Sequence, residues 1–523
     1  MPAEVIFMLS VRHVSVTHQK DLRELIHDLS FTLSAGDRLA VIGEEGNGKS
    51  TLLRCVCGLD TSDYCLWTGE IDAPGERMGY LPQEIPADKR ALPVYAFCAE
   101  SADFLEASPR ELAALCARLR LPADLCYADQ TVENLSGGEK VKLQLLLLLC
   151  AHPTLLVLDE PSNDLDLSAL AFLETFIREC AQPVLYISHD ETLLSRTATR
   201  VLHLEMAHHK KEPRWTLANV PYEQYMRERA HALERQEEMA QMERREERAQ
   251  QERFQRIQQA VEHAQNAISR QNPSGGRLLK KKMKAVKSLE RRFERERSEQ
   301  TQRPNIEYAI DASFFGDHSL PAGKRVLDFS LPELRAGDRV LARNIDLTMI
   351  GPEKVLLCGD NGCGKTTLLS LIAAAVSARG EADCLLMPQR YEDTLPEAQT
   401  PIRFLHTRGD KEQLTRLRTA LGAFKFTREE MEHPIAALSG GQKAKLLWLQ
   451  AILSDARFLL LDEPTRNLSP LSAPAVRQLL LDFEGAVLAV THDRVLMRMW
   501  PGRVLRLSSD GLTRLSAEEV ERL

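Results

Sequence analysis

Short runs of aliphatic residues recur along the chain, and polar or glycine-rich segments follow each of them. Four such runs cover residues 38–42, 155–158, 354–358 and 459–461, so none exceeds the length of a strand. An uninterrupted aliphatic run of this length is typical of a β-strand that is buried on both faces of a parallel sheet. Longer apolar stretches of helical length follow the first and third runs. The pattern therefore predicts α/β domains with a parallel sheet.

The same set of short motifs occurs twice, in the same order. Because order and spacing are kept, the sequence predicts that a whole domain is duplicated. The paired motifs are GEEGNGKST at 43–51 and GDNGCGKTT at 359–367, LSGGE at 135–139 and LSGGQ at 438–442, LLVLDEP at 155–161 and LLLDEP at 459–464, and SHD at 188–190 and THD at 491–493.

The segment between the two copies has a different pattern. From Tyr222 to Arg270 it contains no Pro or Gly, which predicts one long helix. The sequence NPSGG at 272–276 predicts a turn, and residues 277–297 predict a returning helix. We therefore expect a first domain at 1–221, a helical hairpin at 222–303 and a second domain at 304–523.

Apolar residues in the predicted hairpin recur at steps of three and four, which favours an antiparallel coiled coil. At 1.5 Å per residue the longer helix would extend roughly 70 Å. The stripe residues are Phe254, Ile257, Val261, Ala264 and Ile268 on the outgoing helix, and Leu279, Met283, Val286 and Phe293 on the returning helix.

Composition places the chain among ordinary globular proteins, with 44% hydrophobic and 27% charged residues. The most apolar run, Leu145 to Ala151, is far shorter than the roughly 18 residues that a membrane span needs. The N-terminus lacks the pattern of a signal peptide. The 11 cysteines include no CxxC pair, which favours reduced thiols. We therefore expect a cytoplasmic protein without a membrane segment.

Each GxxxxGK[ST] motif lies between a strand-like run and a helix-like stretch, which is the context that a phosphate-binding loop requires. Glycines let backbone N–H groups turn toward the β-phosphate, the lysine reaches the β- and γ-phosphates, and the hydroxyl binds Mg²⁺. A glycine-rich turn that matches by chance is disfavoured, because the context occurs twice. We predict ATP and Mg²⁺ as ligands of Gly43, Gly46, Gly48, Lys49, Ser50, Thr51, Gly359, Gly362, Gly364, Lys365, Thr366 and Thr367.

Two strand-like runs end in Asp-Glu, at the end of a parallel strand where ligands bind in α/β sheets. Asp159 and Asp462 suit coordination of Mg²⁺ together with the loop hydroxyls. Glu160 and Glu463 suit positioning and deprotonation of the attacking water. An Asp-Glu pair alone more often begins a loop, but the phosphate loop upstream favours catalysis.

Both halves resemble ATP-binding cassette (ABC) ATPase domains. In that family the LSGG[QE] signature opens a helix that faces the γ-phosphate bound by the other cassette, a glutamine senses Mg²⁺ and the attacking water, and a histidine contacts the γ-phosphate. The resemblance implies two ATP molecules clamped between the cassettes of one monomer. The matching residues are Ser136, Gly137, Gly138, Ser439, Gly440 and Gly441 of the signatures, Gln83 and Gln389, and His189 and His492.

The segment after the second Asp-Glu-Pro departs from this family's pattern. In the first copy residues 162–166 read SNDLD, the usual D-loop, whereas residues 465–469 read TRNLS. Arg466 replaces a small polar residue, and Ser469 replaces the final aspartate. Because both glutamates and both histidines remain, we expect two competent ATP sites with unequal turnover.

The predicted hairpin is basic although the chain is acidic. Residues 222–303 hold 20 Lys and Arg against 14 Asp and Glu, a net charge of +6, which leaves −14 for the rest of a chain whose net charge is −8. This favours docking against RNA phosphates. A solvated coiled coil with incidental lysines is the alternative. The predicted RNA-binding residues are Arg270, Arg277, Lys280, Lys281, Lys282, Lys284 and Lys287.

Two cassettes without a membrane domain, joined by a charged hairpin, resemble the ABC-F family of cytosolic ATPases. Members bind the ribosome near the tRNA exit site and direct the hairpin toward the peptidyl-transferase centre. The resemblance implies ribosomal RNA and P-site tRNA as partners, and no transmembrane partner. The intervals from Gln83 to Leu135 and from Gln389 to Leu438 are similar in length, so we expect no additional arm, and we expect no C-terminal extension after Leu523.

Armless members with an extended linker resemble the ribosome-protection proteins that confer antibiotic resistance, and we favour that function. A translation factor without a resistance role is the first alternative. An ATPase subunit of a transporter would lack a basic hairpin, and a DNA-repair ATPase would carry zinc modules, for which this chain has no cysteine pairs.

Overall fold

The computed structural model describes residues 8–207, 212–267, 314, 318–378, 383–391, 394–406 and 411–523. The chain divides into a unit of Met1–Tyr222 with Glu307–Leu523 and a unit of Glu223–Ile306. Both copies of the duplicated motifs lie in the first unit. The three-domain division expected from the sequence stays a prediction, because the two halves share one unit.

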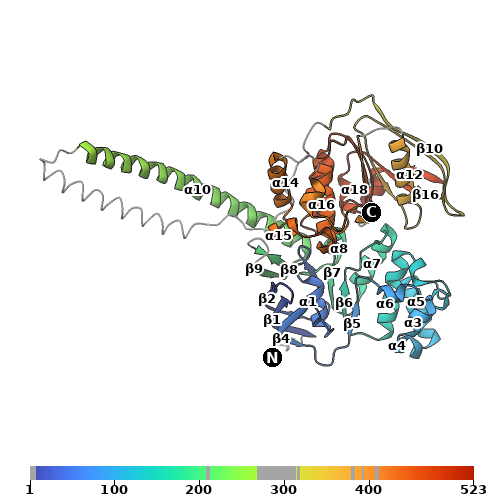
Figure 1. The fold of residues 1–523 in the computed structure, drawn as a ribbon. Helices are drawn as coiled ribbons and strands as arrows, with labels where there is room; N and C mark the ends of the chain where they lie inside the picture. The colour runs from blue at the N-terminus through green and yellow to red at the C-terminus, as the bar shows by residue number, and fades with distance from the viewer. Residues whose placement is uncertain are drawn as a thin grey trace. The chain divides into compact units, whose positions relative to one another are not determined.

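The first half contains a six-stranded sheet in the order β5-β6-β7-β3-β8-β9 (Figure 1). All neighbours are parallel except β8 and β9. Every residue of β6 is buried, which accounts for its continuous aliphatic run. A three-stranded antiparallel sheet has the order β2-β1-β4. The strands are β1 Leu9–His18, β2 Glu24–Leu33, β3 Arg38–Ile42, β4 Cys65–Asp72, β5 Met78–Leu81, β6 Leu155–Asp159, β7 Val184–Ile187, β8 Arg200–Met206 and β9 Glu212–Ala218.

The second half repeats this sheet strand for strand, in the order β13-β14-β15-β12-β16-β17. Only its last pair is antiparallel. The predicted α/β class and the duplication are therefore confirmed. A separate antiparallel pair joins β10 and β11. The strands are β10 Arg325–Ala336, β11 Arg339–Ile350, β12 Lys354–Cys358, β13 Cys384–Met387, β14 Phe458–Asp462, β15 Ala486–Val490, β16 Arg503–Ser508 and β17 Gly511–Arg514.

Helices make up most of the segment between β5 and β6 and of its counterpart between β13 and β14. Those of the first half are α1 Lys49–Val56, α2 Ala87–Arg90, α3 Val94–Ala99, α4 Ala102–Glu106, α5 Pro109–Leu119, η1 Leu125–Tyr127, η2 Val132–Asn134, α6 Gly137–Cys150, α7 Leu167–Glu179 and α8 Glu191–Thr197. Those of the second half are α12 Lys365–Ala378, α13 Pro401–Leu405, α14 Lys411–Ala423, α15 Arg428–Glu432, η4 Ile435–Ala437, α16 Gly440–Leu453, α17 Ala473–Asp482, α18 Arg494–Met499 and α19 Ala517–Arg522.

The helix α10, Tyr222–Ala267, is continuous over 46 residues (Figure 1). It confirms the predicted long helix as far as Ala267. The predicted turn at 272–276 and the returning helix at 277–297 lie outside the described residues, so the coiled coil stays a prediction. Among the helices that the structure describes, none is both long and apolar enough to cross a membrane.

A buried arginine links the second half to the first. Arg494, at the start of α18, is only 2% exposed. Its guanidinium donates hydrogen bonds to the carboxylate of Glu174 on α7 and to both carboxylate oxygens of Asp190, at 3.0 and 3.1 Å. Because a buried charge without a partner is costly, this contact constrains how the two halves face each other.

A second buried arginine makes the reciprocal contact. Arg477 on α17 donates to Glu191 of the first half and to Asp493 of its own half, both at 2.7 Å. The Asp-Glu-Pro and His-Asp motifs have the same spacing in both halves, and at that spacing Glu174 aligns with Arg477 and Glu191 with Arg494. Two like halves would bring acid against acid or arginine against arginine. The reversed charges therefore favour pairing of unlike halves.

Replacing Arg494 with Gln tests this constraint. It removes the cation that the buried Glu174 shares with Asp190 and leaves Glu174 with Arg196 alone, and breaking a buried ion pair costs about 3–5 kcal/mol. We expect the midpoint of thermal unfolding, measured by differential scanning calorimetry, to fall by about 3–5 °C. The matched control is Arg466→Gln, which breaks a more exposed ion pair with Asp164, and its effect should stay within about 1 kcal/mol. Equal effects of the two variants would contradict the constraint.

Candidate functional site

Each phosphate loop runs from a central strand to the following helix, from β3 to α1 and from β12 to α12. Gly43 and Gly359 pass close to the neighbouring strand. A Cβ would lie 2.2 Å from the carbonyl oxygen of Leu204 at the first position, and 2.6 Å from that of Leu507 at the second. Gly46, Gly48, Gly362 and Gly364 all have positive φ, as a tight loop requires.

The two loop lysines are held inside their loops. Lys49 and Lys365 are 7% and 8% exposed. Each ammonium donates to the carbonyl oxygens of the first two residues of its own loop, at 2.9 and 3.0 Å for Lys49 and at 2.8 and 2.9 Å for Lys365. The positive charge is thus placed where the predicted phosphates would bind. Thr51 and Thr367 lie in the first turn of the helix that follows.

The carboxylates predicted for Mg²⁺ lie beside the loop hydroxyls. Ser50 donates to Asp159 at 2.9 Å, and Thr366 is hydrogen-bonded to Asp462. Burial raises the pKa of both aspartates, because its effect outweighs the opposing effect of these hydrogen bonds. Within the described part of the chain, Oδ1 of Asp462 is buried and has no hydrogen-bond partner. An orphaned carboxylate oxygen beside a hydroxyl fits a Mg²⁺ ligand.

Among the residues that the structure describes, acidic and histidine side chains do not form a complete metal centre by themselves. Among the described residues, no group of three or more His, Cys, Asp and Glu could hold a metal ion. A magnesium ion at these loops would therefore take its other ligands from phosphate and water, as Mg²⁺ does in nucleotide sites.

Glu160 and His189 form a charged pair in the first half. Nε2 of His189 lies 2.7 Å from Oε1 of Glu160, and Nδ1 lies 3.0 Å from the carbonyl oxygen of Leu468 in the other half. Both ring nitrogens face acceptors, so the ring carries both protons. Burial would raise the pKa of Glu160, but His189 and Lys49 outweigh it and hold the pKa at about 2. Burial would lower the pKa of His189, but the negative charge of Glu160 and its hydrogen bond outweigh burial and raise that pKa.

The corresponding pair in the second half has the opposite protonation. Burial, reinforced by Asp462, raises the pKa of Glu463 to about 8. Burial, with the nearby Lys365 ammonium, lowers the pKa of His492 to about 3. Nε2 of His492 is 3.5 Å from Oε1 of Glu463. At neutral pH the second pair is therefore mainly uncharged.

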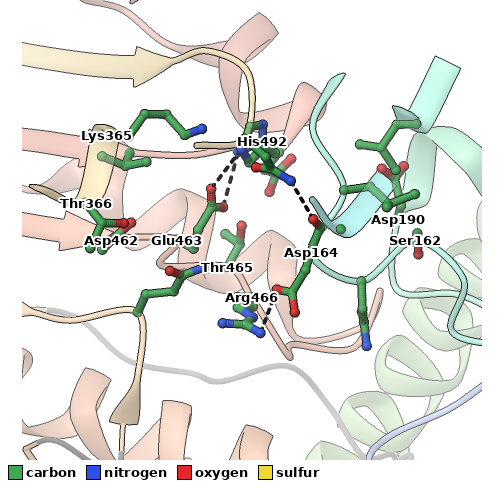
Figure 2. A pocket seen from close by; sticks show the side chains of 18 of the residues that line it. Ser162, Asp164, Asp190, Lys365, Thr366, Asp462, Glu463, Thr465, Arg466 and His492 are labelled. Atoms are coloured by element: carbon green, nitrogen blue, oxygen red, sulfur yellow. Dashed lines mark hydrogen bonds and ion pairs between the residues drawn. The ribbon is translucent and has the colours of Figure 1, made fainter. Parts of the chain in front are cut away.

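One substitution contributes to this difference. The side-chain amide of Asn163 donates to Glu160 at 2.9 Å and stabilises its charged form. The aligned residue of the second half is Arg466, whose guanidinium instead lies 2.6 Å from Asp164 of the first half (Figure 2). Glu463 thus lacks the hydrogen bond that Asn163 gives to its counterpart. This is the departure that the sequence singled out after the second Asp-Glu-Pro.

The signature motifs begin the helices α6 and α16. Ser136 and Ser439 cap these helices, and the following Glu139 and Gln442 complete a capping box in each. The last residue of the LSGG[QE] motif therefore has a structural role. Each signature places backbone N–H donors at the positive end of its helix dipole, and in α16 the N–H group of Gly441 donates to Glu45 of the first half.

The second phosphate loop opens on a cavity of about 750 Å³. Lys365, Thr366, Asp462, Glu463 and His492 converge there (Figure 2). The lining also includes Gln389, and the first half contributes Gly137, Lys140, Asp164 and His189. The residues predicted for the second ATP site are thus brought together with part of the first signature.

Residues from the D-loops touch the phosphate loop of the opposite half. The side-chain amide of Asn361 donates to the carbonyl oxygen of Asp164 at 2.7 Å, and its backbone N–H donates to Asp166 at 3.1 Å. On the other side, Ser469 donates to the carboxylate of Glu44. The two halves therefore face each other head to tail.

Several contacts were not predicted from the sequence. Glu44 and Glu45 of the first phosphate loop bind Lys445 and Ser439 of the second half, at 2.9 and 2.8 Å. The one available signal was that the second loop has Asn361 in place of Glu45. Gln83 is exposed, in the loop after β5. All seven predicted RNA-binding residues, from Arg270 to Lys287, lie outside the described residues.

Comparison with known proteins agrees with this architecture. A family model described as ABC transporter matches residues 26–163 and 342–466, just over half of the chain. The chain is similar to the ribosome protection protein VmlR of Bacillus subtilis, with 28% identity over 95% of this chain and 86% of VmlR. It is also similar to the energy-dependent translational throttle protein EttA of Haemophilus influenzae, with 27% identity over 94% of this chain and 90% of EttA.

Among solved structures, the fold is similar to that of the archaeal ribosome recycling factor aABCE1, crystallised with the ribosomal stalk protein aP1. The TM-score is 0.59 at 16% identity, and the match covers 98% of this chain and 91% of aABCE1. At this identity the likeness concerns the fold alone. The family match, which includes both phosphate loops and both Asp-Glu pairs, decides the assignment: this chain belongs to the ABC transporter family and carries its ATPase domain twice.

Proposed function

We propose that this chain is an ABC-F ATPase that hydrolyses ATP at two composite sites, binds the ribosome in the cytoplasm, and protects it from antibiotics. The observation that carries the proposal is the head-to-tail facing of the halves. The second phosphate loop contacts Asp164 and Asp166, and the first contacts Ser439 and Ser469. An ATP molecule bound by one half would therefore also meet the other.

In the first composite site, Lys49 and the loop N–H groups would hold the phosphates of ATP. Ser50 and Asp159, with Gln83, would hold Mg²⁺, which neutralises phosphate charge when bound. Glu160, whose pKa is about 2, is ionised at neutral pH and would accept a hydrogen bond from the attacking water and position it. His189 would contact the γ-phosphate from the same side.

In the second composite site, Lys365, Thr366, Asp462 and Gln389 would have the corresponding roles. Glu463, with its pKa raised to about 8, holds a proton at neutral pH and cannot act as a base until that proton leaves. This difference supports unequal turnover at the two sites.

The ribosome as partner rests on three observations. The relatives VmlR and EttA are named for ribosome protection and for translation. The 46-residue helix α10 stands between the two halves in the sequence. The seven basic residues that follow, from Arg270 to Lys287, supply the positive charge that binding to RNA phosphates needs. We propose that a coiled-coil hairpin built on α10 reaches ribosomal RNA and P-site tRNA.

A translation factor without a resistance role is the second candidate. It is favoured by the similarity to EttA, a throttle protein by name, over nearly the same share of the chain. A subunit of a transporter has less support, because the basic segment from Arg270 to Lys287 would have no partner there.

Replacing both Glu160 and Glu463 with Gln should abolish most ATP hydrolysis. Loss of a general base costs typically about 10²–10⁴-fold in kcat, and the single Glu160→Gln variant should lose more than Glu463→Gln because Glu160 is the ionised base. Phosphate release at saturating ATP and Mg²⁺ measures this. The control Glu518→Gln, on the exposed helix α19, should retain full activity. Equal losses in the two single variants would contradict unequal sites.

The same double variant should remain closed around ATP and bind ribosomes tightly. We expect it to co-sediment with 70S particles when ATP is present and to remain in the supernatant without nucleotide. A further change of Lys280, Lys281 and Lys282 to Gln should weaken co-sedimentation and reduce its dependence on salt. Absence of the protein from the ribosome pellet in ATP would favour the transporter subunit.

Expression in a drug-sensitive bacterial host tests protection. We expect the inhibitory concentration of at least one ribosome-targeting drug to rise, and the rise to disappear when Lys49 and Lys365 are both changed to Ala. Drugs that act on the cell wall serve as controls and should be unaffected. Unchanged inhibitory concentrations for all ribosome-targeting drugs would leave the translation factor as the better account.

A further inference from the structure

The first phosphate loop places a carboxylate in the signature of the opposite half. Oε2 of Glu45 accepts a hydrogen bond from the hydroxyl of Ser439 at 2.8 Å and from the backbone N–H of Gly441 at 2.6 Å. These two donors begin the 14-residue helix α16. The carboxylate therefore lies at the positive end of that helix dipole, where an anion is stabilised.

The signature leaves space for this anion because it lacks a side chain. A Cβ on Gly441 would lie 2.1 Å from Oε1 of Glu45 and 2.6 Å from Oε2. The hydroxyl, the N–H group and the missing Cβ together form a cradle for a group with several acceptor oxygens. A carboxylate has two such oxygens and a terminal phosphate has three, so the cradle suits both.

The neighbouring residue holds Glu45 in this position. The carboxylate of Glu44 is buried and accepts hydrogen bonds from Lys445 at 2.9 Å, from Ser472 at 2.8 Å and from Ser469. Burial would raise the pKa of Glu44, but Lys445 and Ser469 lower it to about 2. Glu44 is thus a fixed anion that attaches the first phosphate loop to the second half. The loop cannot withdraw Glu45 without also disturbing this contact.

The second phosphate loop is built differently. At the position of Glu45 it carries Asn361, whose uncharged amide donates to the carbonyl oxygen of Asp164 at 2.7 Å. It contributes no carboxylate, so no anion from this position competes at the first signature. The two composite sites therefore differ in charge at the same position of the duplicated phosphate loop.

We propose that Glu45 is an internal anion that occupies the γ-phosphate position of the first composite site, so that ATP must displace it before the halves close on nucleotide there. This inference rests on the proposed function, because it needs ATP bound by the first loop and read by the second signature. It makes Glu45 a residue that sets the affinity of one site for the triphosphate. The diphosphate, which lacks the competing group, is unaffected.

The test measures binding of fluorescent ATP and ADP analogues to the full chain. Lys365→Ala is present throughout, so that the titration reports the first site. Glu45→Gln keeps the shape and removes the charge, and Glu45→Asn reproduces the second loop. Because hydrogen bonds to charged groups are worth more than those to neutral groups, we expect ATP affinity to rise roughly tenfold or more in both variants. ADP affinity should change less than about twofold by the same reasoning.

The reciprocal experiment places the carboxylate in the other loop. In a Lys49→Ala chain, Asn361→Glu should weaken ATP binding at the second site by about the factor gained at the first, again with little effect on ADP. A control variant, Asn361→Gln, keeps the amide, and its preference for ATP over ADP should match that of the Lys49→Ala chain. This design separates a charge effect from damage to the loop, because damage would weaken ATP and ADP together.

The outcomes are distinguishable. A gain in ATP affinity without a matching gain for ADP supports the inference. ATP binding that does not depend on residue 45, or equal gains for ATP and ADP, overturns it and leaves the proposed function intact. Failure of every variant to bind either nucleotide overturns both.

Discussion

Five ionisable groups, of which Arg494, Arg477 and Glu174 are buried, meet where the two halves of the first unit join. Arg494 faces Glu174 and Asp190, and Arg477 faces Glu191. An arginine removed from water without a carboxylate partner would cost several kcal/mol, so the arginines favour the observed pairing, which gives each of them a carboxylate of the first half. The same pairing brings each phosphate loop into contact with residues of the opposite half.

The duplicated domain has diverged at positions that face each other. An acid in the first half corresponds to an arginine in the second at two places on the junction. At the phosphate loops the first half again carries the acid, because Glu45 corresponds to the neutral Asn361 of the second half. A further change, Arg466 in place of Asn163, removes a hydrogen bond to the glutamate and contributes to the opposite protonation of the two glutamate–histidine pairs. Similar folds can therefore give two sites of different chemistry.

Much of the candidate site was predictable because its determinants are local in sequence. A phosphate loop needs glycines with positive φ, a lysine and a hydroxyl within nine residues, and residues 43–51 and 359–367 contain all of them. The buried strands ending at Asp159 and Asp462 were equally predictable, since a parallel strand covered on both faces requires an aliphatic run. The helix α10 followed from the absence of Pro and Gly.

The sequence by itself therefore determined the fold class, the duplication and the residues that suit ATP and Mg²⁺, because hydrophobic periodicity and loop chemistry act over short stretches of chain. It did not indicate that Glu45 would reach Ser439, nearly 400 positions away, or that His189 would face Leu468. Those contacts depend on how two separately folded halves pack, and only the tertiary structure decides which side chains meet there. The pKa values of Glu160 and Glu463 also depend on the tertiary structure, because burial and neighbouring charges set them.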